Sequence, residues 1–223
     1  MSRRSASELV VLVTGYGAFS SHKVNPSLLA VEELKKRGLQ LDEDLKKLDF
    51  TGIKLVVKEL SVEYAHVDEV MPKLFEQYEP SLVVCVGVSS MAPQVTVEQF
   101  ANCYGYCTVD NRGECPPGNR CTTLSDFPSS GKFRSAIDMT MISKSPLLQE
   151  AGVEVCVSED AGSFLCDYVY CTAMGLQEVR GWPLDSVFVH VPPLNEPHSL
   201  DELARQLQVI IKAILLQVAE KKK

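Results

Sequence analysis

The sequence predicts an α/β protein, specifically a single-domain α/β/α sandwich with a mostly parallel, twisted sheet and helices on both faces. Short apolar runs alternate along the chain with longer stretches whose apolar residues recur at helical spacing. The runs are nearly continuous in apolar residues, as at 82–86, which is typical of strands buried on both faces of a parallel sheet. No repeat, linker or domain boundary is visible, so we expect residues 1–223 to form one domain, with flexible tails at 1–8 and 219–223.

The first half of the chain begins with an apolar run at residues 9–13 that enters a glycine-containing loop, which predicts a buried strand. Asn25 before Pro26 predicts the cap and first residue of a helix, and Gly38 predicts its end. The pattern then predicts a strand at 53–60, a helix at 64–78, a central parallel strand at 81–87 and a half-buried strand at 95–98.

In the second half, residues 102–130 show little periodicity and contain glycine, proline, asparagine and four cysteines, which predicts a long ordered loop. Ser199 and Glu202 have the spacing of a capping box. The pattern predicts a helix at 134–144, a strand at 153–157, a buried helix at 162–176, a strand at 186–191 and an amphipathic helix at 200–218.

Composition excludes several classes of function. With 22 basic and 29 acidic residues the net charge is −7, which disfavours non-specific binding to nucleic acids or anionic membranes. No apolar stretch approaches the roughly 20 residues that span a bilayer. The polar start of the chain lacks the apolar segment of a secretory signal, so we expect a cytoplasmic location and eight free thiols.

Three polar residues are candidates for chemistry at the ends of predicted elements. Cys166 falls in the first turn of a predicted helix, where the helix field favours a thiolate and free N–H groups can bind an oxyanion. His190 lies near the end of its strand, and Glu98 ends another. A nucleophile, a base and an orienting carboxylate are the groups that acyl transfer needs. Taken singly, each has a plainer interpretation: a buried small thiol, a structural histidine and a solvated strand residue.

The four cysteines of the predicted loop, Cys103, Cys107, Cys115 and Cys121, raise the alternative of a zinc site. Structural zinc sites favour two closely spaced cysteine pairs, and this spacing provides none. Reduced thiols are therefore the expected state, and we expect neither metal nor cofactor.

Four parts of the chain match one known family, in the same order and with the same separation between the cysteine and the histidine. The strings Ala-Gly-x-Phe-x-Cys at 161–166 and Val-His-x-Pro at 189–192 are specific when found together. The matching segments are 13–19 with 24–27, 86–89 through 95–98, 158–168 and 188–193. Over residues 11 to about 218, the chain resembles pyroglutamyl peptidase type I, a family of cysteine peptidases that remove N-terminal pyroglutamate from peptides. The sequence of its motifs is similar to that of the animal-type branch.

The resemblance implies a role for each of the three polar candidates. Cys166 would be the nucleophile, His190 the general base and then acid, and Glu98 the residue that orients His190. The implied partners are peptides with an N-terminal pyroglutamate, with no nucleic acid and no membrane; the pattern leaves open whether the protein is a monomer or a homo-oligomer.

The resemblance also implies a substrate pocket made by the first loop and by the residues before the nucleophile. Tyr16 and Phe19 occupy the positions of two loop aromatics, Phe164 and Leu165 precede the cysteine, and Asn25 matches a loop asparagine that supports the pocket. Such an apolar slot with a few hydrogen-bonding groups suits a neutral lactam and would reject proline, which lacks the ring carbonyl.

One alternative remains on the same fold. The first loop departs from the usual family sequence at Ala18 and Ser20, where Pro and Gly are common. A catalytically weak or inactive paralogue that acts as a binding protein would show the same motifs.

Overall fold

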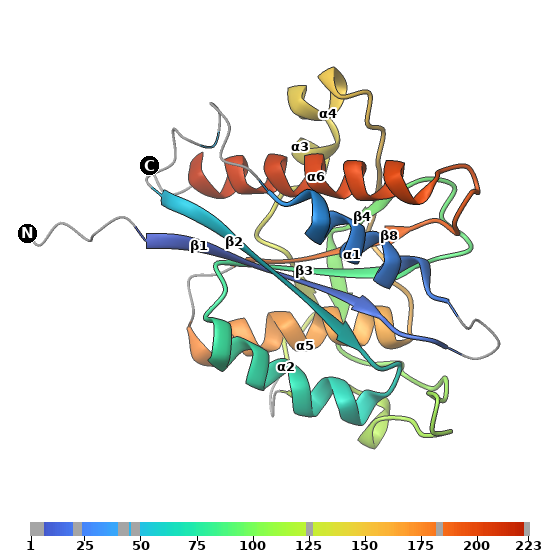
Figure 1. The fold of residues 1–223 in the computed structure, drawn as a ribbon. Coiled ribbons are helices and arrows are strands. Elements are labelled where there is room, and N and C mark those ends of the chain that lie inside the picture. The colour runs from blue at the N-terminus through green and yellow to red at the C-terminus, as the bar shows by residue number, and fades with distance from the viewer. Residues whose placement is uncertain are drawn as a thin grey trace, which may run out of the picture.

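The computed structural model describes residues 7–19, 24–39, 45, 50–123, 127–181 and 185–220. Figure 1 shows their arrangement as a central sheet with helices above and below. The strands are β1 (Ser7–Tyr16), β2 (Phe50–Leu60), β3 (Leu82–Val88), β4 (Thr96–Glu98), β5 (Phe100–Asn102), β6 (Lys132–Arg134), β7 (Cys156–Ser158) and β8 (Asp185–Val191). The helices are α1 (Pro26–Arg37), α2 (Tyr64–Tyr78), α3 (Met139–Ser143), α4 (Pro146–Glu150), α5 (Leu165–Arg180) and α6 (Leu200–Glu220), with a short 3-10 turn, η2 (Pro117–Asn119).

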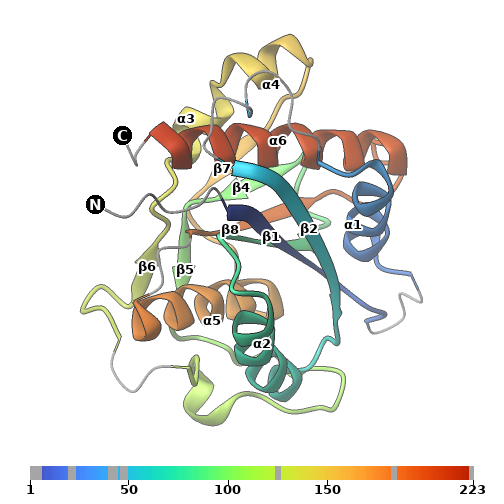
Figure 2. The same cartoon turned by 60° about the vertical axis from the view of Figure 1, so that its left-hand side comes forward.

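The main sheet has six strands in the order β2-β1-β3-β8-β4-β7. Every neighbouring pair is parallel except β4 and β8, which run antiparallel. Helices α1, α3, α4 and α6 cover one face and α2 and α5 cover the other (Figures 1 and 2). The predicted α/β/α sandwich with a mostly parallel sheet is therefore confirmed, and the sequence analysis did not foresee that β4 and β7 run opposite to the other four strands.

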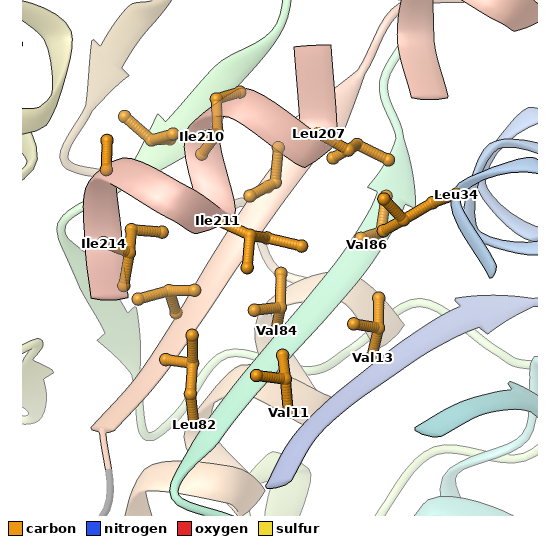
Figure 3. Packing of buried hydrophobic residues seen from close by; sticks show 14 of the residues in the cluster. Val11, Val13, Leu34, Leu82, Val84, Val86, Leu207, Ile210, Ile211 and Ile214 are labelled. Carbon is orange, nitrogen blue, oxygen red and sulfur yellow. The ribbon is translucent and has the colours of Figure 1, made fainter. Parts of the chain in front are cut away.

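Two apolar layers hold the helices to the sheet. Successive side chains of a strand point to opposite faces, so β1 and β3 contribute to both layers. Val11, Val13, Leu82, Val84 and Val86 pack against α1 and α6, where Figure 3 shows them beside Leu34, Leu207, Ile210, Ile211 and Ile214. Leu12, Val83 and Cys85 pack on the opposite side with residues of α2 and α5. Each such aliphatic side chain contributes about 1.5–3 kcal/mol through burial.

The predicted helix boundaries that depend on capping are confirmed. Asn25 caps α1 by accepting a hydrogen bond from Ser27 N, and Pro26 is the first helical residue. Gly38 follows the helix with φ of 70°, a conformation that glycine adopts without a steric penalty. At α6, Ser199 and Glu202 exchange the reciprocal bonds of a capping box, with Ser199 N 2.8 Å from Glu202 Oε2 and Glu202 N 3.3 Å from Ser199 Oγ.

The helix predicted at 134–144 is wrong over its first half. Arg134 belongs to β6, and the helical residues are those of the short helices α3 and α4. The Gln99 side chain donates to the carbonyls of Ser135 and Ile137 at 3.1 and 3.0 Å and accepts from Met139 N at 3.0 Å. These bonds satisfy backbone groups outside a helical ladder, so the segment stays non-helical up to α3.

Three other boundaries differ from the prediction. The strand at 95–98 is buried along its whole length rather than half-buried, because β4 lies inside the sheet between β8 and β7. Only the end of the 153–157 run forms a strand, β7. The helix expected from residue 162 begins at Leu165, because Gly162 has φ of +94° and the chain is still extended at Phe164.

The described residues of the predicted loop at 102–130 are largely irregular, as expected, and a bridge between Tyr104 and Arg120 joins its two sides. Of the tails predicted at 1–8 and 219–223, residues 1–6 and 221–223 lie outside the described residues, as does Ser20 of the first loop. Ser7 and Glu8 belong to β1, and Ala219 and Glu220 belong to α6. No helix in the described ranges is both long and apolar enough to cross a membrane.

Candidate active site

A cavity of about 590 Å³ lies at the carboxyl ends of β1, β3 and β8. This is the edge at which open parallel sheets bind ligands. Its walls come from Phe19, residues 25–26, 88–93 and 160–164, and the side chains of Thr96, Glu98, Cys166, His190 and Pro193. All three polar residues singled out in the sequence therefore line one cavity.

Glu98 and His190 form the buried pair at its base. His190 Nδ1 lies 2.8 Å from Glu98 Oε1, and the two residues are only 7% and 2% exposed. Sheet register explains the contact: Thr96 is directly opposite His190 in the antiparallel pair, so Glu98, two residues on, points to the same face as a diagonal neighbour. The remaining carboxylate oxygen, Oε2, is buried without a hydrogen-bond partner.

The imidazole of His190 has a raised pKa. Burial lowers its pKa, but hydrogen bonds to Cys166 and to Glu98 outweigh burial and raise the pKa to about 9. Cys166 lines the same cavity, and its sulfur lies against Gly87, the register partner of His190. Thiol, imidazole and carboxylate thus form one continuous chain of contacts.

Cys166 lies in the first turn of α5, as predicted; it is the second helical residue and is half-buried. Its sulfur lies over Gly87 of β3: a Cβ placed on Gly87 would be 2.6 Å from Sγ. The N-cap residue, Phe164, supplies no side-chain hydrogen bond to the helix. The N–H groups of the first turn, beside the sulfur, therefore lack a side-chain cap.

Three of the five predicted pocket residues line the cavity: Phe19, Asn25 and Phe164. The Phe19 and Phe164 rings lie 6.1 Å apart between centroids, and Phe164 meets Tyr64 edge-on at 6.0 Å. These rings make one end of the cavity aromatic.

Tyr16 and Leu165 do not line the cavity; both side chains are buried in the layer beneath it. The Tyr16 hydroxyl donates to the Leu165 carbonyl. Burial, with smaller contributions from Cys166, Cys85 and Tyr64, raises the pKa of Tyr16 well above its usual value, so the hydroxyl remains a donor. This bond joins the end of β1 to the first turn of α5.

Asn25 holds the two ends of the first loop (residues 17–25) together. Its Nδ2 donates to Gly17 O at 3.1 Å, and its Oδ1 accepts from Ser27 N at 3.1 Å. Asn111 of the long 102–130 loop donates to Ala18 O at 3.0 Å, so the two loops support each other beside the cavity.

The four cysteines considered as zinc ligands do not gather together. Cys103 and Cys121 are buried and lie within hydrogen-bonding reach of Cys171 of α5, whereas Cys107 is exposed and Cys115 is partly exposed. Among the residues that the structure describes, no group of three or more histidine, cysteine, aspartate or glutamate side chains is arranged to hold a metal ion. All eight cysteines are free.

Sequence reasoning missed two residues at the site. Gly87 makes room for the sulfur; a glycine inside a strand, where a backbone or ligand often approaches closely, was the available signal. Asp167, next to Cys166, is fully buried and accepts hydrogen bonds from Asn102 N at 3.0 Å and Tyr106 Oη at 3.2 Å. Its partners come from β5 and the long loop, so no local pattern indicated its role.

Comparisons with known proteins show which family this chain belongs to. The family model described as pyroglutamyl peptidase matches residues 9–219. Pyroglutamyl-peptidase 1 of Homo sapiens is 42% identical over 205 residues, covering 92% of this chain and 89% of the relative. The Pyroglutamyl-peptidase 1-like protein of Homo sapiens is 32% identical over 172 residues, covering 77% and 82%.

Solved structures support the fold. Pyrrolidone carboxyl peptidase from Thermococcus litoralis superposes with a TM-score of 0.77 at 22% identity and covers 96% of both chains. Pyroglutamyl peptidase I from Bacillus amyloliquefaciens gives a TM-score of 0.74 at 22% identity, covering 93% of this chain and 97% of the other. The family model spans nearly all the described residues, and the human relative is 42% identical over 92% of this chain. This chain therefore belongs to the pyroglutamyl peptidase family of cysteine peptidases.

Proposed function

We propose that this protein is a cysteine peptidase that removes pyroglutamate from the N-terminus of peptides. The observation that supports it most strongly is the single chain of contacts from the Cys166 thiol through His190 to Glu98 in the base of one cavity. The names of its curated relatives agree with this activity. The Cys-His-Glu arrangement is the nucleophile, base and orienting group that acyl transfer needs.

In the proposed mechanism, the thiol proton of Cys166 is held by His190, and the Cys166 sulfur attacks the carbonyl carbon that joins pyroglutamate to the next residue. The N–H groups of the first turn of α5 stabilise the oxyanion. When the C–N bond breaks, the His190 imidazolium protonates the leaving amine, and a thioester remains on Cys166. His190 then deprotonates a water molecule, which hydrolyses the thioester and releases free pyroglutamate and the thiol.

We assign the aromatic end of the cavity to the lactam ring. Phe19 and Phe164 offer apolar faces on which a compact neutral ring can pack. Asn25 acts on the shape of the first loop through its bond to Gly17 O. Tyr16 and Leu165 act indirectly, because their hydrogen bond fixes the first turn of α5 relative to β1.

The alternative of a non-catalytic binding protein is less well supported. The chain is 42% identical to human Pyroglutamyl-peptidase 1 and 32% identical to the 1-like protein. It also retains a thiol, an imidazole and a carboxylate in contact, an arrangement that binding alone does not need. For the location we propose the cytoplasm, because eight free thiols suit a reducing compartment.

The proposal is tested with purified, reduced protein on a chromogenic pyroglutamyl amide beside the matching prolyl amide. We expect release of the chromogenic amine from the pyroglutamyl amide and almost none from the prolyl amide. Proline lacks the ring carbonyl, so the hydrogen-bonding groups of the pocket would have no partner on it. Cys166→Ala should lower kcat by about 10⁴-fold or more while the far-UV spectrum and melting temperature stay close to wild type. Normal turnover by Cys166→Ala, or no turnover by folded wild type, would contradict the proposal.

A further inference from the structure

The cavity is larger than a lactam ring requires. Its volume of about 590 Å³ lies in the range that holds drug-sized ligands, whereas the pyroglutamyl group is one small ring with a single attached carbonyl. Phe19 and Phe164, assigned above to the lactam, form only one end. The rest of the space is therefore open to the part of the peptide that follows pyroglutamate.

Chemistry fixes the side on which that part lies. His190 must deliver its proton to the leaving nitrogen, so the residue that leaves has to pass the imidazole side of Cys166. The wall on that side is the connection between β3 and β4, because Gly87 and Thr96 are the register partners of His190 on either side. Ser89 N donates to Val191 O at 3.0 Å, which fixes this connection over the end of β8.

The connection presents an apolar surface with one prominent side chain. Met91 lines the cavity and is 89% exposed, the largest exposed fraction among the exposed large apolar side chains of the described residues. A tight turn holds it there, with Met91 N 3.3 Å from Ser89 Oγ and Ala92 N 3.2 Å from Ser89 O. Ala92, Pro93 and Pro193 extend the apolar lining. A flexible, polarisable thioether adapts to apolar groups of different shapes.

The charge of the cavity lining also favours an apolar side chain over an acidic one. Apart from the Glu98–His190 pair, in which the two opposite charges offset each other, the lining has one charged side chain, Asp160, and no lysine or arginine. An acidic side chain entering this space would meet Asp160, and the His190 cation is already paired with Glu98. An apolar side chain would cover Met91 and remove its surface from water.

We infer that Met91 and its apolar neighbours form the subsite for the residue that follows pyroglutamate, that this subsite favours large apolar side chains and that it disfavours acidic ones. The inference rests on the proposed peptidase function and adds the substrate class to it. Met91 is a specificity-determining residue in this assignment, not a catalytic one.

The test uses amidated dipeptides with pyroglutamate followed by Phe, Leu, Gly or Asp, and measures release of the amino-acid amide. For wild type we expect kcat/KM to be highest for Phe and Leu, lower for Gly and lowest for Asp. Met91→Ala should lower the Phe-to-Gly ratio of kcat/KM by about 5- to 20-fold, because the buried apolar contact is lost. Met91→Leu should keep most of the ratio, and Met91→Gln should lose it.

Met141→Ala is the matched control, since Met141 is 59% exposed and lies away from this cavity. It should leave the ratio at the wild-type value. If Met91→Ala cleaves pyroglutamyl-Gly amide but keeps the wild-type Phe-to-Gly ratio, the subsite is wrong while the peptidase function stands. If folded wild type cleaves none of the four peptides, the peptidase function itself fails.

Discussion

Gly87 is the direct register partner of His190 in the parallel pair β3–β8. The missing side chain of Gly87 is what allows the Cys166 sulfur to lie beside the imidazole, because a Cβ there would be 2.6 Å from Sγ and 2.8 Å from Phe188 Cζ. A glycine that takes no part in the chemistry thus makes room for the nucleophile beside the base.

Replacing this glycine should damage both catalysis and stability. In Gly87→Ala the new methyl group must displace Cys166 or Phe188, and a shift of about 1 Å at the nucleophile can cost about 10²-fold in rate. Overpacking should also lower the free energy of unfolding by about 1–3 kcal/mol. Steady-state kinetics and urea unfolding measure the two effects. Gly52→Ala is the control, because the nearest atom to a Cβ on Gly52 would be 3.9 Å away. Equal losses of rate and stability in the two variants would contradict the explanation that Gly87 makes room for Cys166.

The raised pKa of His190 predicts the alkaline limit of activity. The imidazolium must protonate the leaving amine, and His190 holds its proton up to about pH 9, so kcat/KM should fall as pH rises through that value. Burial alone lowers this pKa, and the contacts with Cys166 and Glu98 raise it. Glu98→Gln should therefore move the alkaline limb to lower pH and lower kcat by about 10²- to 10⁴-fold.

Because the thiol and the imidazole interact, the apparent pKa in such a profile belongs to the pair. Glu69→Gln is the control for removing one negative charge, since Glu69 is a surface residue of α2 that pairs with Lys73. Its pH profile should match wild type. An alkaline limb that stays in place in Glu98→Gln would show that the carboxylate does not support the imidazolium.

Asn25 has two roles that two variants separate. Asn25→Ala removes the helix cap and the bond to Gly17 O, so it should lower the free energy of unfolding by about 1 kcal/mol and raise KM several-fold. Asn25→Asp keeps the acceptor for Ser27 N but cannot donate to Gly17 O, so stability should stay near wild type while KM still rises. Urea unfolding and steady-state kinetics distinguish these outcomes. A normal KM in Asn25→Asp would mean that the bond to Gly17 does not shape the pocket.

Asp167 makes stability depend on pH. Burial raises its pKa from 3.8 to about 7, although hydrogen bonds from Asn102 and Tyr106 oppose the shift. Because the pKa is higher in the folded state, the folded protein binds more protons between those values, and the free energy of unfolding falls as pH rises from about 4 to about 7. Each pKa unit is worth about 1.4 kcal/mol, so the loss is at most about 4 kcal/mol.

Asp167→Asn removes this titration while keeping nearly the same shape. The difference in unfolding free energy between the variant and wild type should therefore shift in favour of the variant as pH increases from 4 to 8. Urea unfolding at several pH values measures it. A difference that is constant over this range would show that Asp167 titrates normally in the folded protein.

Local patterns predicted most of the framework because they depend on neighbours in the chain. The Asn25-Pro26 start of α1, the capping box at Ser199 and Glu202 and the apolar run of β3 all have short-range causes. The position of Cys166 in the first turn of α5 also follows from local sequence, even though the helix begins later than expected. The family motifs identified which of several polar residues to consider together.

What the sequence alone determined is therefore the order of most strands and helices, the covering of the sheet by helices on both faces and the set of chemical groups available for acyl transfer. Tertiary structure decided how those groups meet. Strand β4 runs antiparallel to β8, which brings Glu98 to the same face as His190, and Gln99 holds the segment after β6 out of a helix. These outcomes depend on sheet register and on hydrogen bonds between residues far apart in the chain, and no local periodicity records such contacts.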